Sequence, residues 1–284
     1  MTTEADGDEG SRVRSEWESA AAGWDAQTPV IRPWLEAATR AMIGQAGIRS
    51  GSRVLDVAAG AGDQTCDIAR IAGSEGRVLA VDLAPALIAR LRERLVREGL
   101  TGVEARVADA QASLPEVEAF DAAVCRLGLM LMAEPARCAQ SVRRALRSGG
   151  VFAALVFARP DRNPCLRILI ETVVEHTGLP VNDPFRPGSL FSLGPPGRIE
   201  AVFASAGFGD IASSIIDAPF RLPTVDRYIA FVRIAGGPVR SLLATLGPDR
   251  QEAAWQDAAD RLRVFDRDGG WVGPASLILA VGTA

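Results

Sequence analysis

The chain has 284 residues, of which 48% are hydrophobic and 23% charged, so it is long enough to bury a large core. Its basic residues are all Arg and are outnumbered by acids, and the formal charge of −4 argues against a general nucleic-acid or anionic-membrane surface. The absence of Lys excludes Schiff-base chemistry and a Walker-type loop, and a single histidine, His176, excludes a multi-histidine metal site.

The N-terminal part of the chain carries helical patterns ahead of the first strand-like run. Residues 1–11 are small, acidic and aperiodic, which predicts a disordered tail without a signal peptide. Residues 12–48 contain two helical patterns that carry Trp17, Trp24 and Trp34, and they predict a helical lid. Apolar runs elsewhere are too short to cross a bilayer, so the sequence predicts a cytoplasmic protein without membrane insertion.

From residue 49 onward, strand and helix signals alternate. Strand signals occur in RVLDVAA, GRVLAVDL, VEARVADA, FDAAVCRL and VFAALVF, with helical patterns such as PALIARLRERLVREG and EPARCAQSVRRALRSGG between them. This rhythm predicts an α/β fold, a doubly wound and mostly parallel sheet with helices on both faces. Later strand signals in DIASSIIDAPFRL and ASLILAVGT bring the expected sheet to seven strands.

The regular alternation stops after Ala158. Residues 159–195 form an insertion-like segment rich in Pro and Gly, and residues 222–270 are mostly helical. Both segments are expected to face a substrate. The run from Arg159 to Arg162 follows the fifth strand, where it is either part of a substrate loop or an ordinary solvated loop.

The cysteines show no C-x-x-C spacing, and most of them lie in apolar-periodic segments. This arrangement predicts buried free thiols that make neither a disulfide nor a metal site. The residues concerned are Cys66, Cys125, Cys138 and Cys165.

The turn after the first strand, VLDVAAGAGD, is a candidate ligand loop. In open α/β sheets the ligand binds beyond the carboxyl ends of the strands, and Gly60 and Gly62 would let the backbone approach it closely. Thr65 occupies the place where a dinucleotide fingerprint needs Gly or Ala. Asp56 and Asp63 would repel a pyrophosphate, whereas they suit a ligand that carries an ammonium group.

Two further acids end the second and third strands. Asp82 lies 20 residues after Gly62, where a carboxylate can accept both hydroxyls of a ribose, and Asp109 could accept from an adenine amino group. Adenine, ribose and an amino-acid ammonium group together describe S-adenosylmethionine. Taken singly, each of these residues could instead be an ordinary turn former or, for Asp63, a helix N-cap.

The segments VLDVAAGAGD, AVDLAP, VADAQ, FDAAVCRLGLM and RRALRSGG resemble class I S-adenosylmethionine-dependent methyltransferases, in the branch that includes the ubiquinone and menaquinone C-methyltransferases. The likeness covers residues 50 to about 158 and, through SAGFGDI, extends to about residue 211. It implies a Rossmann-like methyltransferase domain over residues 49–284. Ala58 departs from the first glycine of D-x-G-x-G-x-G, and Ser148 replaces a usual proline.

The resemblance also implies a cofactor site at the ends of the first four strands. Asp56, Gly60 and Gly62 would surround the methionine moiety, Asp82 would bind the ribose, and Asp109 would lie near the adenine. S-adenosylhomocysteine would be the product. The other implied cofactor contacts are Trp24, Ala58, Ala59, Gln64, Leu83, Ala110, Arg126 and Leu127.

The expected reaction is methyl transfer to a small-molecule acceptor, such as an aromatic, quinone-like or secondary metabolite. It requires no metal. His176 is the candidate general base, although a lone His at a helix end is often only a favourable cation there, and Tyr228 carries the same uncertainty. Trp24 could cover the sulfonium by a cation–π contact or simply pack, and Met130 and Met132 could face an apolar acceptor or the core.

Two alternatives stay open at this point. A methyltransferase fold could bind S-adenosylmethionine for a non-methylating reaction or an interaction role, since no universal catalytic residue exists to test. An NAD-dependent oxidoreductase is the other alternative, against which Thr65 and the missing Y-x-x-x-K pair count. A homodimer is compatible with the sequence, and no nucleic-acid partner is expected.

Overall fold

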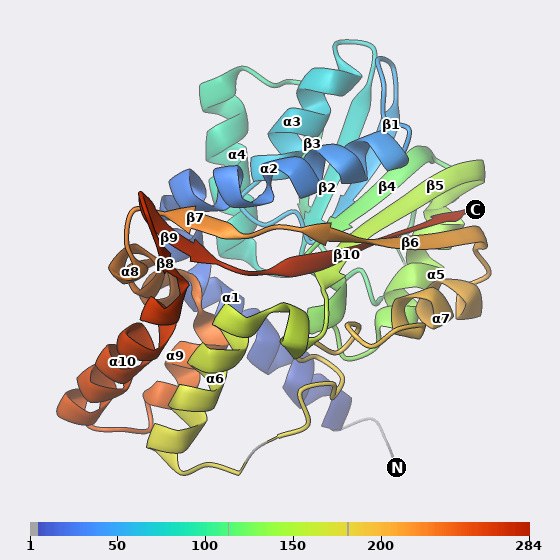
Figure 1. The fold of residues 1–284 in the computed structure, drawn as a ribbon. Coiled ribbons are helices and arrows are strands. Elements are labelled where there is room, and N and C mark those ends of the chain that lie inside the picture. Colours follow the sequence, from blue (N-terminus) through green and yellow to red (C-terminus); the bar gives the residue numbers. More distant parts are fainter. Residues whose placement is uncertain (1–4, 113, 181) are drawn as a thin grey trace.

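The computed structural model describes residues 5–112, 114–180 and 182–284, and a seven-stranded sheet forms its centre (Figure 1). The strand order is β3-β2-β1-β4-β5-β10-β6, in which β10 runs antiparallel to both β5 and β6 and the other pairs are parallel. This confirms the predicted doubly wound, mostly parallel sheet. The strands are β1 (Arg53–Val57), β2 (Arg77–Asp82), β3 (Val103–Val107), β4 (Phe120–Arg126), β5 (Leu146–Phe157), β6 (Gly209–Asp217) and β10 (Ser276–Thr283).

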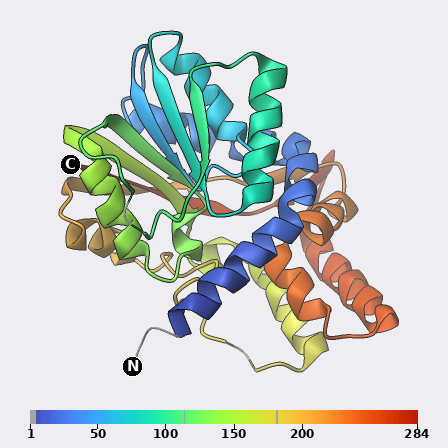
Figure 2. The same ribbon diagram turned by 180° about the vertical axis from the view of Figure 1, so that it is seen from behind.

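Helices cover both faces of this sheet (Figures 1 and 2). Phe157 and Phe152 of β5 have opposite parity and so point to opposite faces. Phe157 stacks on Trp34 at 6.0 Å between ring centroids, and Phe152 stacks on Phe203 at 4.9 Å. One face carries α2 (Thr28–Gln45) and α3 (Asp63–Ala72), with α4 (Pro85–Glu98) beside α3, and the other carries α5 (Pro135–Ala145) and α7 (Arg198–Ser205).

The helix ends follow the chemistry of their residues. Pro85 opens α4 in the first turn, where its missing N–H costs nothing, and Gly99 ends it in the left-handed region at φ 65°. Leu87, Ile88, Leu91 and Leu95 form the buried side of α4, as the amphipathic pattern predicts.

A group of helices lies beyond the carboxyl ends of the parallel strands (Figure 1). A short sheet of order β7-β9-β8 packs beside them, with Trp271 of β9 fully buried. The helices are α1 (Ala5–Ala26), α6 (Pro164–Thr177), α8 (Val225–Ala235), α9 (Gly237–Leu243) and α10 (Pro248–Leu262), the short strands are β7 (Phe220–Leu222), β8 (Asp266–Arg267) and β9 (Gly270–Gly273), and the 3-10 turns are η1 (Leu129–Leu131), η2 (Pro160–Arg162) and η3 (Arg263–Phe265).

The structure corrects three local predictions. Helix α1 begins at Ala5, so residues 5–11 continue a helix instead of forming a disordered tail, because extending a nucleated helix needs little further support. Residues 1–4 lie outside the described residues. Helix α5 stops at Ala145, and LRSGG starts β5. The run DIASSIIDAPFRL forms two strands, β6 and β7, in different sheets.

Other expectations concern the cysteines and the membrane. All of the cysteines are free and buried, as predicted, and burial raises the pKa of the Cys125 thiol to about 12, so this thiol stays protonated and inert. Within the described part of the chain, the helices are too short or too polar to cross a bilayer.

Candidate cofactor and acceptor site

A cavity opens at the carboxyl ends of β1, β2, β3 and β4, under helix α1. Its walls come from the glycine loop after β1, the ends of β2 and β3, the turn after β4, and the inner side of α1. Most of the residues predicted to contact the cofactor line it, and these are Trp24, Ala58, Ala59, Gly60, Gln64, Asp82, Leu83, Asp109, Ala110, Arg126 and Leu127.

The two glycines of the loop do different work. Gly60 has a φ of 57°, and a β-carbon added there would lie 4.0 Å from Nε1 of Trp24, so the indole lies over the loop. At Gly62, φ is 84° and an added β-carbon would lie 2.1 Å from Cδ1 of Leu91. Gly62 therefore allows α4 to pack against the loop and does not line the cavity, which corrects its predicted contact with the methionine moiety.

Ala58 holds the first glycine position of the loop in the left-handed region, at φ 54°. A β-carbon added to the neighbouring Gly128 would lie 2.4 Å from Cβ of Ala58. The space between the turn after β1 and the turn after β4 therefore holds the Ala58 methyl group but no second β-carbon. Because Ala58 has a β-carbon, its left-handed backbone conformation introduces about 1–2 kcal/mol of strain that glycine would not have.

We expect Ala58→Gly to raise the free energy of unfolding by about 0.5–1 kcal/mol, because the relief of strain exceeds the added entropy of an unfolded glycine. Gly128→Ala should lower it by about 1–3 kcal/mol through overpacking against Ala58. Urea unfolding of both single variants and the double variant tests this. An additive double variant would contradict the contact, since Ala58→Gly should rescue part of the Gly128→Ala loss.

Asp82 ends β2 with its carboxylate at the cavity wall. Its Oδ2 accepts from the backbone N–H of Gly60 at 2.9 Å, and its Oδ1 accepts from that of Ala84 at 3.0 Å. Burial raises the pKa of Asp82, while these backbone donors oppose the shift. Each carboxylate oxygen can accept more than one hydrogen bond, so both remain able to bind a pair of hydroxyls.

Asp109 and Gln111 follow β3 on the next part of the wall. Oδ1 of Asp109 accepts from the backbone N–H of Gln111 at 2.9 Å, which forms a tight turn. Gln111 in turn accepts from the backbone N–H of Glu134 at 2.8 Å, which joins this turn to the start of α5. These two hydrogen bonds tie the end of β3 to the start of α5.

Asp56 lies beneath the loop and does not line the cavity. It is fully buried in β1, where its carboxylate accepts from Nε2 of Gln64 at 2.5 Å and from Oγ1 of Thr65 at 2.7 Å. This corrects the predicted contact with the methionine moiety, because the side chain turns toward α3 and holds the first turn of that helix. Burial raises the pKa of Asp56 to about 6.

The raised pKa makes the stability pH-dependent. The folded protein holds this proton more tightly than the unfolded chain, so the contribution of Asp56 is most favourable below its unfolded pKa of about 4 and is lost as pH rises through about 6. Between about pH 4 and pH 7.5, the free energy of unfolding of the wild type should fall by about 2–3 kcal/mol relative to that of Asp56→Asn. Urea unfolding of both proteins measures it, and a constant difference would contradict the assignment.

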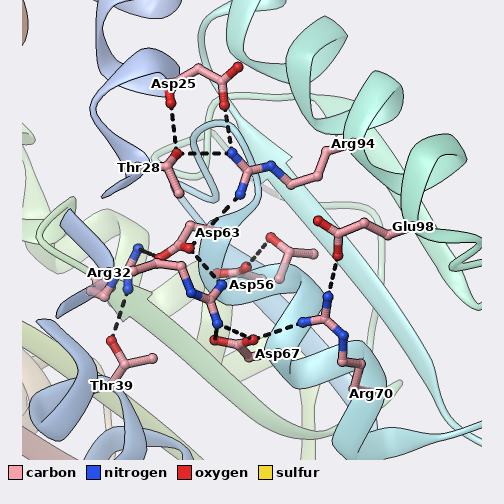
Figure 3. A network of polar contacts seen from close by, with 12 residues as sticks. Asp25, Thr28, Arg32, Thr39, Asp56, Asp63, Asp67, Arg70, Arg94 and Glu98 are labelled. Atoms are coloured by element: carbon pink, nitrogen blue, oxygen red, sulfur yellow. Dashed lines mark hydrogen bonds and ion pairs between the residues drawn. The ribbon is translucent and has the colours of Figure 1, made fainter. Parts of the chain in front are cut away.

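Asp63, at the start of α3, is the centre of an ion-pair network (Figure 3). Its carboxylate lies 2.9 Å from Nη1 of Arg32, 2.9 Å from Nη2 of Arg126 and 3.9 Å from Nη1 of Arg94. The Asp63 side chain is 12% exposed, and those of Arg94 and Arg126 are each 8% exposed. This carboxylate therefore compensates buried positive charge instead of only capping a helix.

The network joins the lid to the cavity wall. Nη2 of Arg94 donates to Asp25 at 2.6 Å and to Thr28 at 3.0 Å, at the junction of α1 and α2. Nη1 of Arg126 donates to Oγ1 of Thr39 in α2 at 2.9 Å. Arg126 lines the cavity, so the position of its guanidinium depends on both α2 and α3.

Helix α1 covers the cavity through two tryptophans. Trp17 and Trp24 both line it, with ring centroids 5.6 Å apart and an edge-to-face angle of 85°. The Glu18 carboxylate accepts from the backbone N–H of Ala86 at 3.2 Å, which places a negative charge at the start of α4. The sequence-based prediction of a lid included Trp24 but gave no cavity contact to Trp17.

Comparison with known proteins identifies the central part of the chain. Residues 48–175 match the sequence model of a methyltransferase domain. This segment is therefore similar to a methyltransferase domain, in agreement with the motifs of the sequence. This match favours a methyltransferase over an NAD-dependent oxidoreductase. It also supports S-adenosylmethionine as the cofactor.

Curated relatives of this methyltransferase domain share its sequence over part of their length. The chain is 33% identical over 123 residues to the ubiquinone/menaquinone biosynthesis C-methyltransferase of Marinomonas sp., covering 43% of this chain and 49% of that protein. It is 31% identical over 158 residues to the enzyme of the same name from Teredinibacter turnerae, covering 55% of this chain and 64% of that protein. The matched part of the chain thus spans 49% and 64% of the length of these two relatives.

Solved structures share the fold of the methyltransferase domain at lower identity. The YcgJ protein from Bacillus subtilis superposes with a TM-score of 0.60 at 18% identity, covering 87% of this chain and 98% of that chain. The [4+2]-cyclase SpnF superposes with a TM-score of 0.51 at 21% identity, covering 87% of this chain and 80% of that chain. Such likenesses establish the fold alone.

The methyltransferase cavity does not include the predicted general base. His176 lies near the end of α6, where its Nε2 is 2.9 Å from Oδ2 of Asp257 in α10, and it is not part of the cavity wall. Tyr228 is fully buried between Phe220 and Trp271, with ring centroids 5.0 Å and 4.7 Å away. The prediction of a catalytic His176 is therefore withdrawn, because its imidazole pairs with Asp257 of α10 and does not line the cavity.

Sequence reasoning also missed part of the methyltransferase cavity. The spacing of Trp17 and Trp24 by seven residues places both on one side of a helix, and this signal could have identified Trp17. Met132 lines the cavity, where it could face an acceptor, whereas Met130 is buried and packs in the core. The other lining residues that were missed are Arg14, Leu35, Val81, Leu87, Ala108, Gln111, Gly128, Leu131, Ala133 and Gly188.

Proposed function

We propose that this protein transfers a methyl group from S-adenosylmethionine to a small apolar acceptor, aromatic or quinone-like, bound beneath α1. The observation that carries the proposal is the composition of one cavity. Its sheet side presents Asp82, Asp109 and Arg126, and its lid side presents Trp17 and Trp24. A polar wall for a cofactor thus faces a mainly aromatic wall for an acceptor, to which α1 also contributes Arg14.

The residues of the sheet side fit the cofactor. Asp82 would hold the ribose hydroxyls, and Asp109 with Ala110 would adjoin the adenine. Gly60 would let the backbone approach the methionine moiety, because no β-carbon occupies the space under Trp24. Arg126 would bind the carboxylate of that moiety, since its guanidinium is held at the cavity wall by Asp63 and Thr39.

The residues of the lid side fit an apolar acceptor. Trp17 and Trp24 supply aromatic faces, and Met132 with Leu131 supplies adaptable apolar surface after β4. Aromatic faces also suit a neighbouring sulfonium cation. The curated relatives are named as ubiquinone/menaquinone biosynthesis C-methyltransferases, which agrees with an aromatic or quinone-like acceptor.

Catalysis in this proposal rests on positioning. Bound S-adenosylmethionine supplies an electrophilic methyl group. The chain aligns the acceptor with it, and the indoles of α1 exclude water from the space between them. The described lining includes neither His nor Tyr, so we infer that alignment and desolvation, with no dedicated imidazole or phenol base, account for the rate.

The test is a turnover assay with methyl-labelled S-adenosylmethionine and a panel of phenols, hydroquinones and naphthoquinols. We expect labelled product with at least one of them. Trp24→Ala should lower kcat/KM by about tenfold or more, whereas Trp24→Phe, which keeps an aromatic face, should lower it less.

The panel also distinguishes the alternative role. Tight binding of S-adenosylhomocysteine without turnover of any aromatic acceptor would favour a non-methylating function of the same cofactor site. The [4+2]-cyclase SpnF, which shares the fold, makes that outcome concrete. Turnover only with hydrophilic amines would contradict the proposed acceptor class.

A further inference from the structure

A second cavity lies against helix α1 on the side away from the cofactor cavity. It has a volume of about 450 Å³, is open to solvent, and is lined by residues of α1, α8, α9 and α10 and by Ala244. Ser19 lines it from α1, whereas Trp17 lines the cofactor cavity. Two residues apart on a helix means about 200° of rotation, so the two cavities lie on different sides of α1.

Arg233 of α8 enters this cavity in a fixed orientation. Its Nη2 donates to Oε1 of Glu252 at 2.7 Å, and its guanidinium carbon lies 5.2 Å from the ring centroid of Trp255. Its Nε is buried and has no hydrogen-bond partner among the described residues. The Arg233 side chain is nevertheless 37% exposed, so a ligand anion in the cavity would meet the accessible part of the guanidinium.

Arg240 of α9 brings a second positive charge to the same cavity. Its Nη1 donates to the backbone carbonyl of Ile234 at 3.2 Å, and it forms no ion pair with any carboxylate in the described part of the chain. The lining contains no Asp or Glu among the described residues, and Glu252 compensates only Arg233. The part of the cavity wall that the structure describes therefore carries net positive charge.

The rest of the cavity wall is mixed in character. Trp255 and Leu243 supply apolar surface, and Ser241 and Gln251 add hydrogen-bonding groups. A cavity of this volume is within the range of sites for small organic molecules, and it exceeds what a lone inorganic ion would fill.

We propose that this cavity is a binding site for a small organic anion, in which a carboxylate or phosphate monoester meets Arg233 and Arg240 and an apolar body packs on Trp255. The inference goes beyond methyl transfer and does not depend on it, because its ligand contacts none of the residues assigned to the cofactor or the acceptor. The experiment that tests this proposal measures binding of the anion and does not measure methyl transfer.

The test is a ligand-observed NMR titration of the full chain with benzoate and with phenyl phosphate, and benzyl alcohol serves as the neutral match. We expect saturable binding of at least one anion, about tenfold or more tighter than that of benzyl alcohol. S-adenosylhomocysteine should not displace the bound anion. Displacement would place the anion in the cofactor cavity and overturn the proposal.

Variants assign the binding to this cavity. Arg240→Gln should weaken anion binding about tenfold or more, because it removes the charge that lacks a carboxylate partner. Arg227→Gln, which changes an exposed arginine of α8 outside the cavity, should leave it unchanged. Arg233→Gln should also weaken binding, with thermal unfolding used to confirm that the helices remain folded.

Three results would overturn the proposal: no saturable binding of either anion, equal binding of benzyl alcohol, or undiminished binding by Arg240→Gln. Loss of anion binding in Arg240→Gln with retained binding of S-adenosylhomocysteine would support the site whatever the turnover assay shows. Failure of this proposal and failure of the methyltransferase proposal are therefore separate results.

Discussion

Replacing Asp82 by Ala should weaken the binding of S-adenosylhomocysteine by about 100-fold. The carboxylate is the charged acceptor at the end of β2, and two charge-assisted hydrogen bonds to ribose hydroxyls contribute about 3 kcal/mol together. The same carboxylate accepts from the backbone N–H of Gly60, so its loss also loosens the glycine loop. Isothermal titration calorimetry with the purified full chain measures the change.

Asp82→Asn separates the two effects of that substitution. The amide oxygen can keep one acceptor for Gly60 or for the ribose while the negative charge is lost, so its affinity should fall between those of wild type and Asp82→Ala. Far-UV circular dichroism should show that all three proteins are folded. An Asp82→Ala affinity within about twofold of wild type would contradict the ribose assignment and remove a main support of the cofactor site.

Replacing Asp63 by Ala should lower the free energy of unfolding by about 3 kcal/mol. Removing one partner of a buried ion pair leaves charge uncompensated, and here Arg94 and Arg126 are each only 8% exposed. Arg126 would also lose an anchor at the cavity wall, so binding of S-adenosylhomocysteine should weaken as well. Urea unfolding measures the change in the free energy of unfolding, and calorimetry measures the change in affinity for S-adenosylhomocysteine.

Asp67→Ala is the matched control in the same network. Its carboxylate pairs with Arg32 and Arg70, but it is 30% exposed and those arginines are about half exposed, so water already screens the pairs. The expected loss is about 0–1 kcal/mol, and added salt should reduce it further. Equal losses for Asp63→Ala and Asp67→Ala would show that burial does not set the strength of this network.

Burial also separates the roles of acids that look alike in sequence. Asp56 and Asp82 both end strands next to the same loop, and the resemblance placed both against the cofactor. Asp82 reaches the cavity wall, whereas Asp56 is fully enclosed with Gln64 and Thr65. Which way a strand-end carboxylate turns depends on the helix packed above it, and no spacing in the sequence encodes that direction.

The sequence alone was sufficient for the elements whose signals are local. Apolar runs of strand length, a glycine turn at residues 58–62 and amphipathic helices opened by Pro85 are written in consecutive residues. Those signals predicted the parallel strands, their helices and the edge of the sheet where the cavity opens. Asp82 and Asp109 were predicted in the same way, because the end of a strand is visible in the sequence, and both line the cavity.

Features that depend on contacts between residues far apart in the sequence became visible only in the tertiary structure. The strands β8 and β9 are too short to show a period, and they form by pairing with β7 and burying Trp271. Arg94 and Asp25 lie 69 residues apart, yet their contact fixes the lid over the cavity. His176 has a catalytic residue type but lies on a helix that packs against α10. Local patterns set the elements, whereas the choice of partners rests on packing and charge across the fold.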